Sequence, residues 1–232
     1  MNMICVKWGT KYGPEYVDRL YHMVTKNVTK PFDFYCITDD STGINQAIKI
    51  IPITDDFLES YWNKMRLFTP GSFKGKCFYL DLDTVIQSNI DCFLDYTDKF
   101  CGVYTYWNDI YTDGSYPYAT LKYKTPFNSS ILSWNAEEYY WLWDKFMTDP
   151  DWFIIKYYGD DKFLGNEIKE KTTFPREWIY SRLYGSGDNR PNDALTDNNF
   201  FQYIYFQPEK KICLFNGPTR TEHYDRYKRY WS

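Results

Sequence analysis

The sequence predicts an α/β protein with a mixed, mostly parallel sheet flanked by helices. Two observations lead to this prediction. Short apolar runs typical of buried strands alternate with segments whose apolar residues recur at helical spacing. The first fifty residues follow the order strand, helix, strand, strand, which favours a parallel sheet with ligand chemistry at the carboxyl ends of its strands. The 232 residues are enough for one well-buried domain.

The first half of the chain is expected to contain four strands and two helices. Pro14 suits the first turn of a helix, and apolar residues recur behind it at helical spacing as far as Val28. A second helix is expected over 56–69, with Lys64 off its apolar face. The expected strands are 3–8, 32–38, 47–53 and 77–86, and the last of these has the sequence CFYLDLDTVI.

The second half is expected to add strands at 100–106, 127–134 and 211–217. Asn135 and Glu138 have the spacing of a capping box, which predicts a helix to about Met147, and a short helix is expected over 159–170. Residues 107–125 are rich in Tyr, Asp, Gly and Pro and predict a long loop. Its aromatic side chains are expected to stack on an acceptor, because loops carry function more often than the framework does.

Composition limits the classes of function. The net charge is −4 and the isoelectric point is about 5.3, so the chain lacks the basic footprint of a nucleic-acid-binding protein. The six cysteines include no CxxC pair, and most lie in apolar runs where a free thiol behaves as a small hydrophobe. With no signal peptide or transmembrane segment visible, we expect a reducing, cytoplasmic setting.

Asp81 and Asp83 lie one residue apart in the apolar stretch 77–86. In a strand, residues i and i+2 point to the same face, so two like charges would lie side by side. Burying either carboxylate is costly unless another group neutralises it. One interpretation is structural: both aspartates lie at the polar end of the strand, where water solvates them.

Two functional interpretations compete with the structural one. The first is a divalent metal site, because Mg²⁺ and Mn²⁺ take carboxylate oxygens and keep room for substrate phosphates. The second is a phosphatase of the haloacid dehalogenase type, whose first motif is an apolar strand followed by DxDx(T/V). In that case Asp81 would be a nucleophile and Asp83 a general acid/base, and the segment 157–163 resembles that superfamily's later acidic motif.

The residues before the aspartates favour the metal site. The dehalogenase motif normally follows the first strand of its domain, whereas here about three strands and two helices come first. The segments KWGTKYG, TDD and WNK lie at predicted strand and helix ends, and loops at the ends of parallel strands converge. They supply the aromatic, carboxylate, amide and cationic groups that a base, a ribose and a diphosphate need.

In order along the chain, the motifs ICVKWGTKYGPEYVDRLYHMV, FYCITDD, YWNKMRLF, FYLDLDTVI, PFNSSILSW, YGDDKFL and CLFNG resemble those of a glycosyltransferase with the GT-A fold. The resemblance is to family 8, the glycogenin- and galactosyltransferase-like enzymes, and to their bacterial and phage relatives, and it spans about 3–225. It implies one Rossmann-like GT-A domain over 1–232. Its nucleotide-binding half would cover about 1–105, and its acceptor and donor-sugar half about 106–232.

The resemblance, together with the residue types, assigns roles position by position. The last strand departs from the family pattern, because Phe215-Asn216-Gly217 stands where the family has a histidine that ligates the metal; Asn216 or His223 would replace it. The expected metal ligands are Asp81, Asp83 and Asn216. The expected catalytic residues are Asp160 and Asp161. The expected contacts to the nucleotide-sugar are Val6, Lys7, Trp8, Gly9, Tyr12, Asp39, Asp40, Asn63, Lys64, Leu82, Asn128, Ser129, Gly217 and Arg220.

These assignments imply a metal-dependent glycosyltransferase that uses Mn²⁺ or Mg²⁺. It would transfer a sugar from a nucleotide-diphosphate donor, UDP-linked, to the hydroxyl of a glycan or another acceptor, with retention of configuration. Asp160 or Asp161 would stabilise the oxocarbenium-like sugar. A non-catalytic carbohydrate-binding protein on the same scaffold remains an alternative, because the metal-binding histidine is missing.

Overall fold

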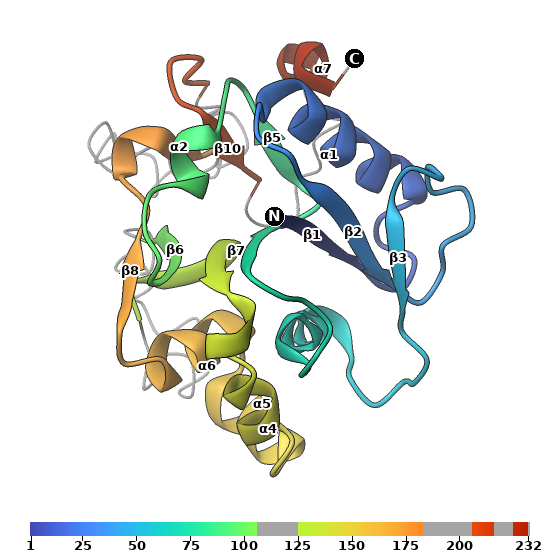
Figure 1. Ribbon diagram of the computed structural model, residues 1–232, viewed down its shortest axis with the longest axis vertical. Helices are drawn as coiled ribbons and strands as arrows, with labels where there is room; N and C mark the ends of the chain where they lie inside the picture. The colour runs from blue at the N-terminus through green and yellow to red at the C-terminus, as the bar shows by residue number, and fades with distance from the viewer. Residues whose placement is uncertain (106–124, 183–205, 216–224, 232) are drawn as a thin grey trace, which may run out of the picture.

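The computed structural model describes residues 1–105, 125–182, 206–215 and 225–231, and it confirms the α/β architecture (Figure 1). The larger sheet has seven strands in the order β3-β2-β1-β4-β7-β6-β8, and within it only β7 is antiparallel to its neighbours. These strands are β1 (Asn2–Lys7), β2 (Asp33–Thr38), β3 (Lys49–Pro52), β4 (Lys76–Leu80), β6 (Phe100–Tyr104), β7 (Phe127–Asn135) and β8 (Lys171–Thr173).

A second, smaller sheet has the order β5-β10-β9. It consists of β5 (Thr84–Ile86), β9 (Ile179–Ser181) and β10 (Ile212–Leu214). The helices of the described residues are α1 (Pro14–Asn27), the 3₁₀ helix η1 (Ser60–Phe68), α2 (Asp91–Leu94), η3 (Ala136–Glu138), α4 (Trp141–Phe146), α5 (Pro150–Tyr157), α6 (Asp160–Glu167), η4 (Arg176–Trp178) and α7 (Asp225–Trp231).

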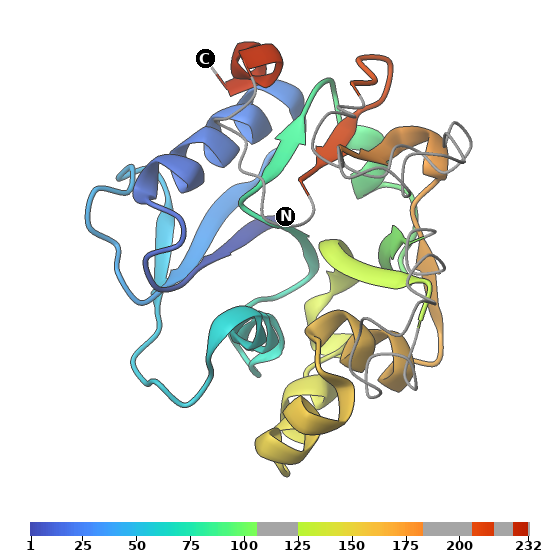
Figure 2. The same ribbon diagram turned by 180° about the vertical axis from the view of Figure 1, so that it is seen from behind.

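Helices and the smaller sheet cover the two faces of the larger sheet. Successive residues of β1 point to opposite faces of the larger sheet and pack in two different hydrophobic clusters. Met3 and Cys5 pack with α1 and the smaller sheet, whereas Ile4 and Val6 pack with η1, α4, α5 and α6. Figures 1 and 2 show α1 and α7 at one end of the picture and η1 with α4–α6 at the other. The strands therefore run between two layers, which is the arrangement expected for a sheet buried on both faces.

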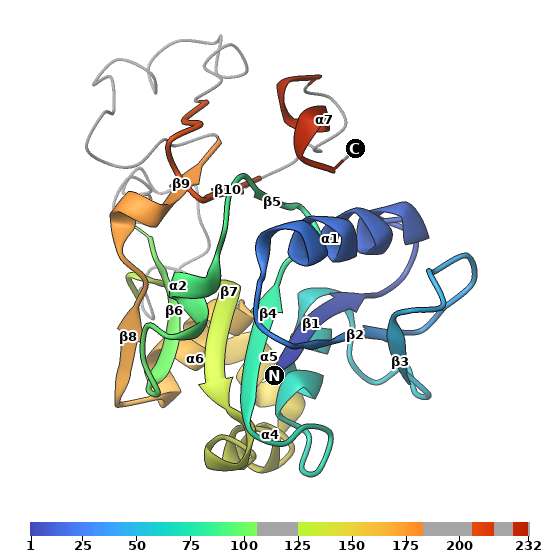
Figure 3. The ribbon, with the colours of Figure 1, turned by 45° about the horizontal axis from the view of Figure 1, so that its top comes forward.

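The expected continuous strand at 77–86 is wrong. Leu80 pairs with Ile131 in the larger sheet, whereas Thr84 pairs with Leu214 in the smaller one. Between them the chain makes a tight turn, in which the Thr84 nitrogen donates to the carbonyl oxygen of Asp81 at 3.1 Å. The two aspartates therefore lie on the crossing from one sheet to the other (Figure 3).

Two expected helices also differ from those observed. The segment 56–69 forms a 3₁₀ helix at 60–68, because the Asn63 side chain donates to the carbonyl oxygens of Leu58 and Ser60 and competes with helical pairing. The segment after Asn135 is divided between η3 and α4. Asn135 belongs to β7, and its side chain donates to Glu138 without capping the backbone.

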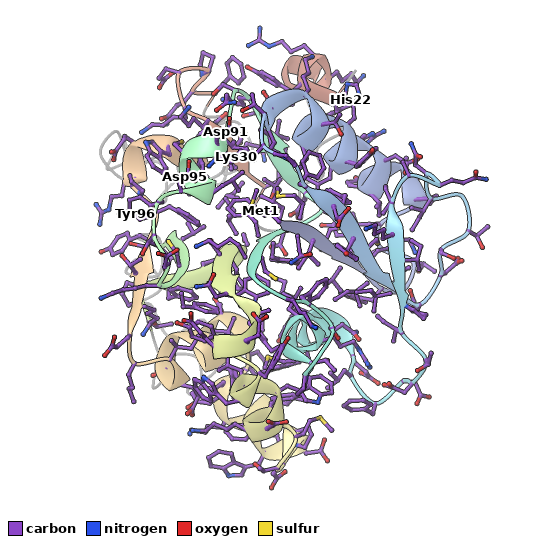
Figure 4. The ribbon with its side chains drawn as sticks, viewed as in Figure 1. Met1, His22, Lys30, Asp91, Asp95 and Tyr96 are labelled. Atoms are coloured by element: carbon purple, nitrogen blue, oxygen red, sulfur yellow. The ribbon has the colours of Figure 1, made fainter. Side chains whose placement is uncertain are left out.

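The connection that follows β5 is fastened to the end of α1. Figure 4 shows Lys30 beside Asp95 and Asp91 of α2, and Lys30 forms an ion pair with Asp95. The Thr29 nitrogen donates to Asp91 at 3.0 Å. These contacts help to hold the smaller sheet against α1.

All six cysteines are free thiols, as the composition predicted. None of the helices in the described part of the chain is long and apolar enough to cross a membrane.

Candidate active site

A cavity of about 290 Å³ lies at the carboxyl ends of β1 and β4. Three segments far apart in sequence form its wall: the loop after β1, the start of η1 and the turn after β4. This is the edge where the loops of parallel strands were expected to converge. The lining residues are Val6, Trp8, Lys11, Tyr12, Ser60, Tyr61, Lys64, Tyr79, Asp81, Leu82 and Asp83.

The loop after β1 is tied to the loop after β2. Gly9 has a φ of 58°, in the left-handed region that glycine adopts without cost, and its nitrogen donates to Asp39 at 2.8 Å. The buried Lys7 donates its ammonium to the carbonyl oxygen of Asp40 at 3.2 Å. Lys7, Gly9, Asp39 and Asp40 thus hold the two loops together, while Trp8 lines the cavity.

Lys64 joins three segments of the chain at the inner end of the cavity. Its Nζ lies 2.9 Å from Oδ1 of Asp81 and 3.7 Å from Oδ2 of Asp160, and it donates to Oγ of Ser129 at 3.2 Å. Ser129 in turn donates to Oδ2 of Asp160 at 2.5 Å. The side chain of Lys64 is only 12% exposed, so these carboxylates and this ammonium interact with little screening by water.

The two aspartates of the crossing have different partners. Asp81 accepts a hydrogen bond from Tyr79 at 2.5 Å, and Asp83 accepts one from Tyr12 at 2.7 Å. Burial raises the pKa of both tyrosines, so they remain protonated donors. Burial and the neighbouring charge of Asp81 together raise the pKa of Asp83 to about 6.

The charges of Asp160 and Lys64 shift each other's pKa. Burial raises the pKa of Asp160 to about 6, although the charge of Lys64 works in the opposite direction. Burial alone would lower the pKa of Lys64, but the charges of Asp160 and Asp81 outweigh that cost and raise it above its ordinary value. Lys64 is therefore a permanent cation between two carboxylates.

The expected catalytic pair has only one member inside this network. Asp160 is buried at the start of α6 and faces Lys64 and Ser129. The carboxylate of Asp161 instead accepts from the backbone nitrogen of Lys162 at 2.8 Å and lies 3.9 Å from its ammonium. The sequence left these two aspartates open as alternatives, and the geometry favours Asp160.

Five of the predicted nucleotide-sugar contacts line the cavity, and the other described ones do not: Lys7, Gly9, Asp39, Asp40, Asn63, Asn128 and Ser129. The amide of Asn63 is engaged with Leu58, Ser60 and Arg66, so it stabilises the turn that carries Lys64. The side chain of Asn128 accepts from the backbone nitrogen of Ser130 at 2.9 Å, at the start of β7. Asn216, Gly217, Arg220, His223 and most of the expected aromatic loop at 107–125 lie outside the described residues.

Sequence reasoning missed three cavity residues: Ser60, Tyr61 and Tyr79. Tyr79 could have been found, because it precedes Asp81 by two residues and so shares its face of the strand. Ser60 and Tyr61 depend on where η1 begins, which periodicity did not reveal.

The carboxylates of Asp81 and Asp83, which lie where the chain crosses between the two sheets, are ligands that suit a hard divalent cation. Asp81 and Asp83 both line the cavity, and the repulsion between their charges contributes to the raised pKa of Asp83. A cation with oxygen preference would relieve that repulsion and retain coordination sites for substrate oxygens. Among residues 1–105, 125–182, 206–215 and 225–231, no group of three His, Cys, Asp or Glu side chains converges on one point.

The chain resembles known proteins in its fold. No protein-family model matches the sequence, and no curated protein matches it significantly. The structure of the galactosyltransferase LgtC with donor and acceptor sugar analogues matches with a TM-score of 0.67 and 13% identity, over 100% of this chain and 95% of that chain. The bifunctional glycosyltransferase WbbM matches with a TM-score of 0.62 and 16% identity, over 99% of this chain and 48% of that one.

The glycosyltransferase GlyE of Streptococcus pneumoniae TIGR4 also matches, with a TM-score of 0.63 and 11% identity, over 99% of this chain and 60% of that one. The chain thus has the fold of these glycosyltransferases, and the expected GT-A architecture is confirmed. It spans nearly the whole length of LgtC but about half the length of WbbM.

Proposed function

We propose that the chain is a metal-dependent glycosyltransferase that moves a sugar from a nucleotide-diphosphate donor, UDP-linked, to an acceptor hydroxyl with retention of configuration. The observation that carries the proposal is the network of Lys64, Asp81 and Asp160 beside a cavity in a glycosyltransferase fold. In the reaction, the bond from the anomeric carbon to the diphosphate breaks and a bond to the acceptor oxygen forms. The nucleoside diphosphate and the acceptor proton are released.

The cavity wall has the groups that a nucleotide diphosphate needs. Trp8 and Tyr12 offer aromatic faces to the base, and Leu82 offers backbone to the ribose. Lys11 adds a cation at the same wall. Val6 completes the apolar floor between these groups.

Asp81 and Asp83 would hold Mn²⁺ or Mg²⁺. When bound, the cation would offset the charge of the leaving diphosphate. Asn216 is the third ligand that we propose, on the sequence resemblance alone. Arg220 and Gly217 remain proposed contacts to the diphosphate.

Asp160 would stand beside the reacting sugar. Its carboxylate would stabilise the positive charge that develops on the oxocarbenium-like sugar. Lys64 would hold Asp160 ionised, and Ser129 would orient it by the hydrogen bond to Oδ2. Lys64 would therefore position the reacting carboxylate and separate its charge from that of Asp81.

The dehalogenase-type phosphatase is not favoured. Asp81 follows the fourth strand of the chain and lies on a crossing between two sheets, whereas that motif normally follows the first strand. Its Oδ1 is also held by Lys64 and Tyr79, which leaves that oxygen poorly placed to attack phosphorus.

The test measures thermal stability with UDP, with and without Mn²⁺, and UDP release from UDP-galactose, UDP-glucose and UDP-N-acetylglucosamine. We expect stabilisation that requires both UDP and Mn²⁺, slow donor hydrolysis, and loss of both effects in Asp81→Asn and Asp83→Asn. Asp98→Asn is the matched control, because the Asp98 side chain is 99% exposed and does not line the cavity. Phosphate release from p-nitrophenyl phosphate without any response to UDP would overturn the proposal, and binding of UDP without turnover would favour the non-catalytic alternative.

A further inference from the structure

Two exposed tyrosines meet beside the candidate active site. Tyr61 lines the cavity and is 37% exposed, while Tyr158 is 53% exposed and precedes Asp160 by two residues. The hydroxyl of Tyr61 donates to the carbonyl oxygen of Tyr158 at 3.1 Å. This contact joins the start of η1 to the residue that ends α5.

Tyr158 adopts a backbone conformation that disfavours a tyrosine. Its φ is 56°, in the left-handed region, and its nitrogen closes α5 by donating to the carbonyl oxygen of Ile154. Glycine or asparagine usually occupies this position at the end of a helix, because a β-carbon there crowds the backbone. A large aromatic side chain therefore reduces stability at this site without being buried in return.

The second strained residue lies on the other side of the same contact. Among the described non-glycine residues, Ser60 is the other one with a positive φ, at 57°. It is the neighbour of Tyr61 and also lines the cavity. Strained backbone of this kind is concentrated where function requires a particular side-chain placement. The strain on both sides indicates that the placement of Tyr61 and Tyr158 serves a purpose other than stability.

We propose that Tyr61 and Tyr158 form a platform on which a sugar ring of the acceptor glycan stacks. A pyranose ring has an apolar face of C–H groups and a rim of hydroxyls, and a tyrosine offers a matching apolar ring with a polar hydroxyl. The proposal rests on the proposed function, and it names a saccharide as the acceptor.

The charges around the platform support this occupant. The hydroxyl of Tyr61 contacts the backbone of Tyr158, which precedes Asp160 by two residues. Burial raises the pKa of Tyr61, and the negative charges of Asp160 and Asp161 contribute to that increase. A sugar seated on the platform would thus have acceptors for its hydroxyl hydrogens beside the reacting centre.

The decisive variant is Tyr158→Gly, which removes the ring and also relieves the strain. We expect the melting temperature of this variant to exceed that of the wild type. We also expect that UDP with Mn²⁺ still raises the melting temperature of the variant. Binding is measured by saturation-transfer NMR with lactose, maltose and cellobiose, in the presence of UDP and Mn²⁺. We expect at least one of these disaccharides to bind the wild type and to bind the variant about tenfold more weakly, as the loss of one stacking contact implies.

Two further variants separate stacking from other effects. Tyr158→Phe keeps the ring and should bind the same disaccharide as the wild type does. Trp152→Ala removes an aromatic side chain that is 49% exposed at the other end of α5, and it should leave both disaccharide binding and donor hydrolysis unchanged.

A wild type that binds none of the three sugars, a glycine variant that binds them equally well, or a glycine variant that melts at a lower temperature would each overturn the proposal. The proposed function is tested separately by the stabilisation that UDP and Mn²⁺ produce. If UDP and Mn²⁺ do not stabilise the protein, the proposed function fails, whether or not the disaccharides bind to the platform.

Discussion

The ammonium of Lys64 lies 2.9 Å from Oδ1 of Asp81, and this ion pair ties η1 to the end of β4. The same ammonium faces Asp160 on α6. One cation thus compensates two carboxylates that come from different elements of the fold.

Lys64→Ala should destabilise the protein by about 3 kcal/mol, because it leaves the buried Asp160 and the partly buried Asp81 without a cation. It should also abolish donor hydrolysis. Urea denaturation at neutral pH gives the free energy of unfolding. Lys162→Ala is the matched control, since its ammonium lies 3.9 Å from Asp161 outside the network, and it should cost less than about 1 kcal/mol. Equal losses in the two variants would contradict the role of Lys64 as the shared cation.

Asp83→Asn should stabilise the metal-free protein by up to about 3 kcal/mol at neutral pH, while removing stabilisation by Mn²⁺ with UDP. The folded state raises the pKa of Asp83 from 3.8 to about 6, so it binds that proton more tightly than the unfolded chain does. The ionised group therefore reduces stability as the pH rises from 3.8 to 6.

Comparing chemical denaturation of the wild type and Asp83→Asn across this range tests the sign. The advantage of the variant should be small below pH 3.8 and reach its full size above pH 6. A difference that stays constant across the range would show that Asp83 is not the group responsible.

Glu167→Gln should have the opposite dependence on pH. Hydrogen bonds from Lys145 and Tyr157 outweigh the effect of burial and lower the pKa of Glu167 below 4.5, and Lys156 lies 3.6 Å away. The contribution of Glu167 is therefore fully present above pH 4.5 and is lost as the pH falls through the lowered pKa. We expect a loss of about 1 kcal/mol at neutral pH that shrinks in acid, as followed by urea denaturation. A loss that persists in acid would contradict the ionic explanation.

Gly102→Ala should destabilise the protein by about 2 kcal/mol, because the strands around it leave no room for a β-carbon. An added Cβ would lie 2.3 Å from the ring of Phe127 and 3.0 Å from the carbonyl oxygen of Asn128, where the register between β6 and β7 shifts. Thermal unfolding measures the effect. Gly75→Asn is the control, since an added Cβ there meets no atom within 4 Å and asparagine tolerates the φ of 69°. A comparable loss at both glycines would indicate that close packing at Gly102 is not the cause.

Most of the framework could be predicted from the sequence because its determinants are local. Pro14 and the helical spacing behind it predicted α1, and short apolar runs predicted β1, β2 and β7. Helix α5 was missed, although Asp149 caps its first turn and Pro150 occupies its first position. The short strands β8 and β9 have only three residues each, too few to show a period.

The sequence by itself determined the order of the strands and helices apart from α5, β8 and β9, the pair Asp81 and Asp83 as a candidate cation site, and the loops that would surround them. These depend on spacing within one segment, which periodicity and motif order preserve. Only the tertiary structure decided that the chain crosses between two sheets at this pair and that Lys64, Ser129 and Asp160 share one network. Residues so far apart in the chain meet because helices pack on a sheet face, and the resulting contacts leave no local pattern in the sequence.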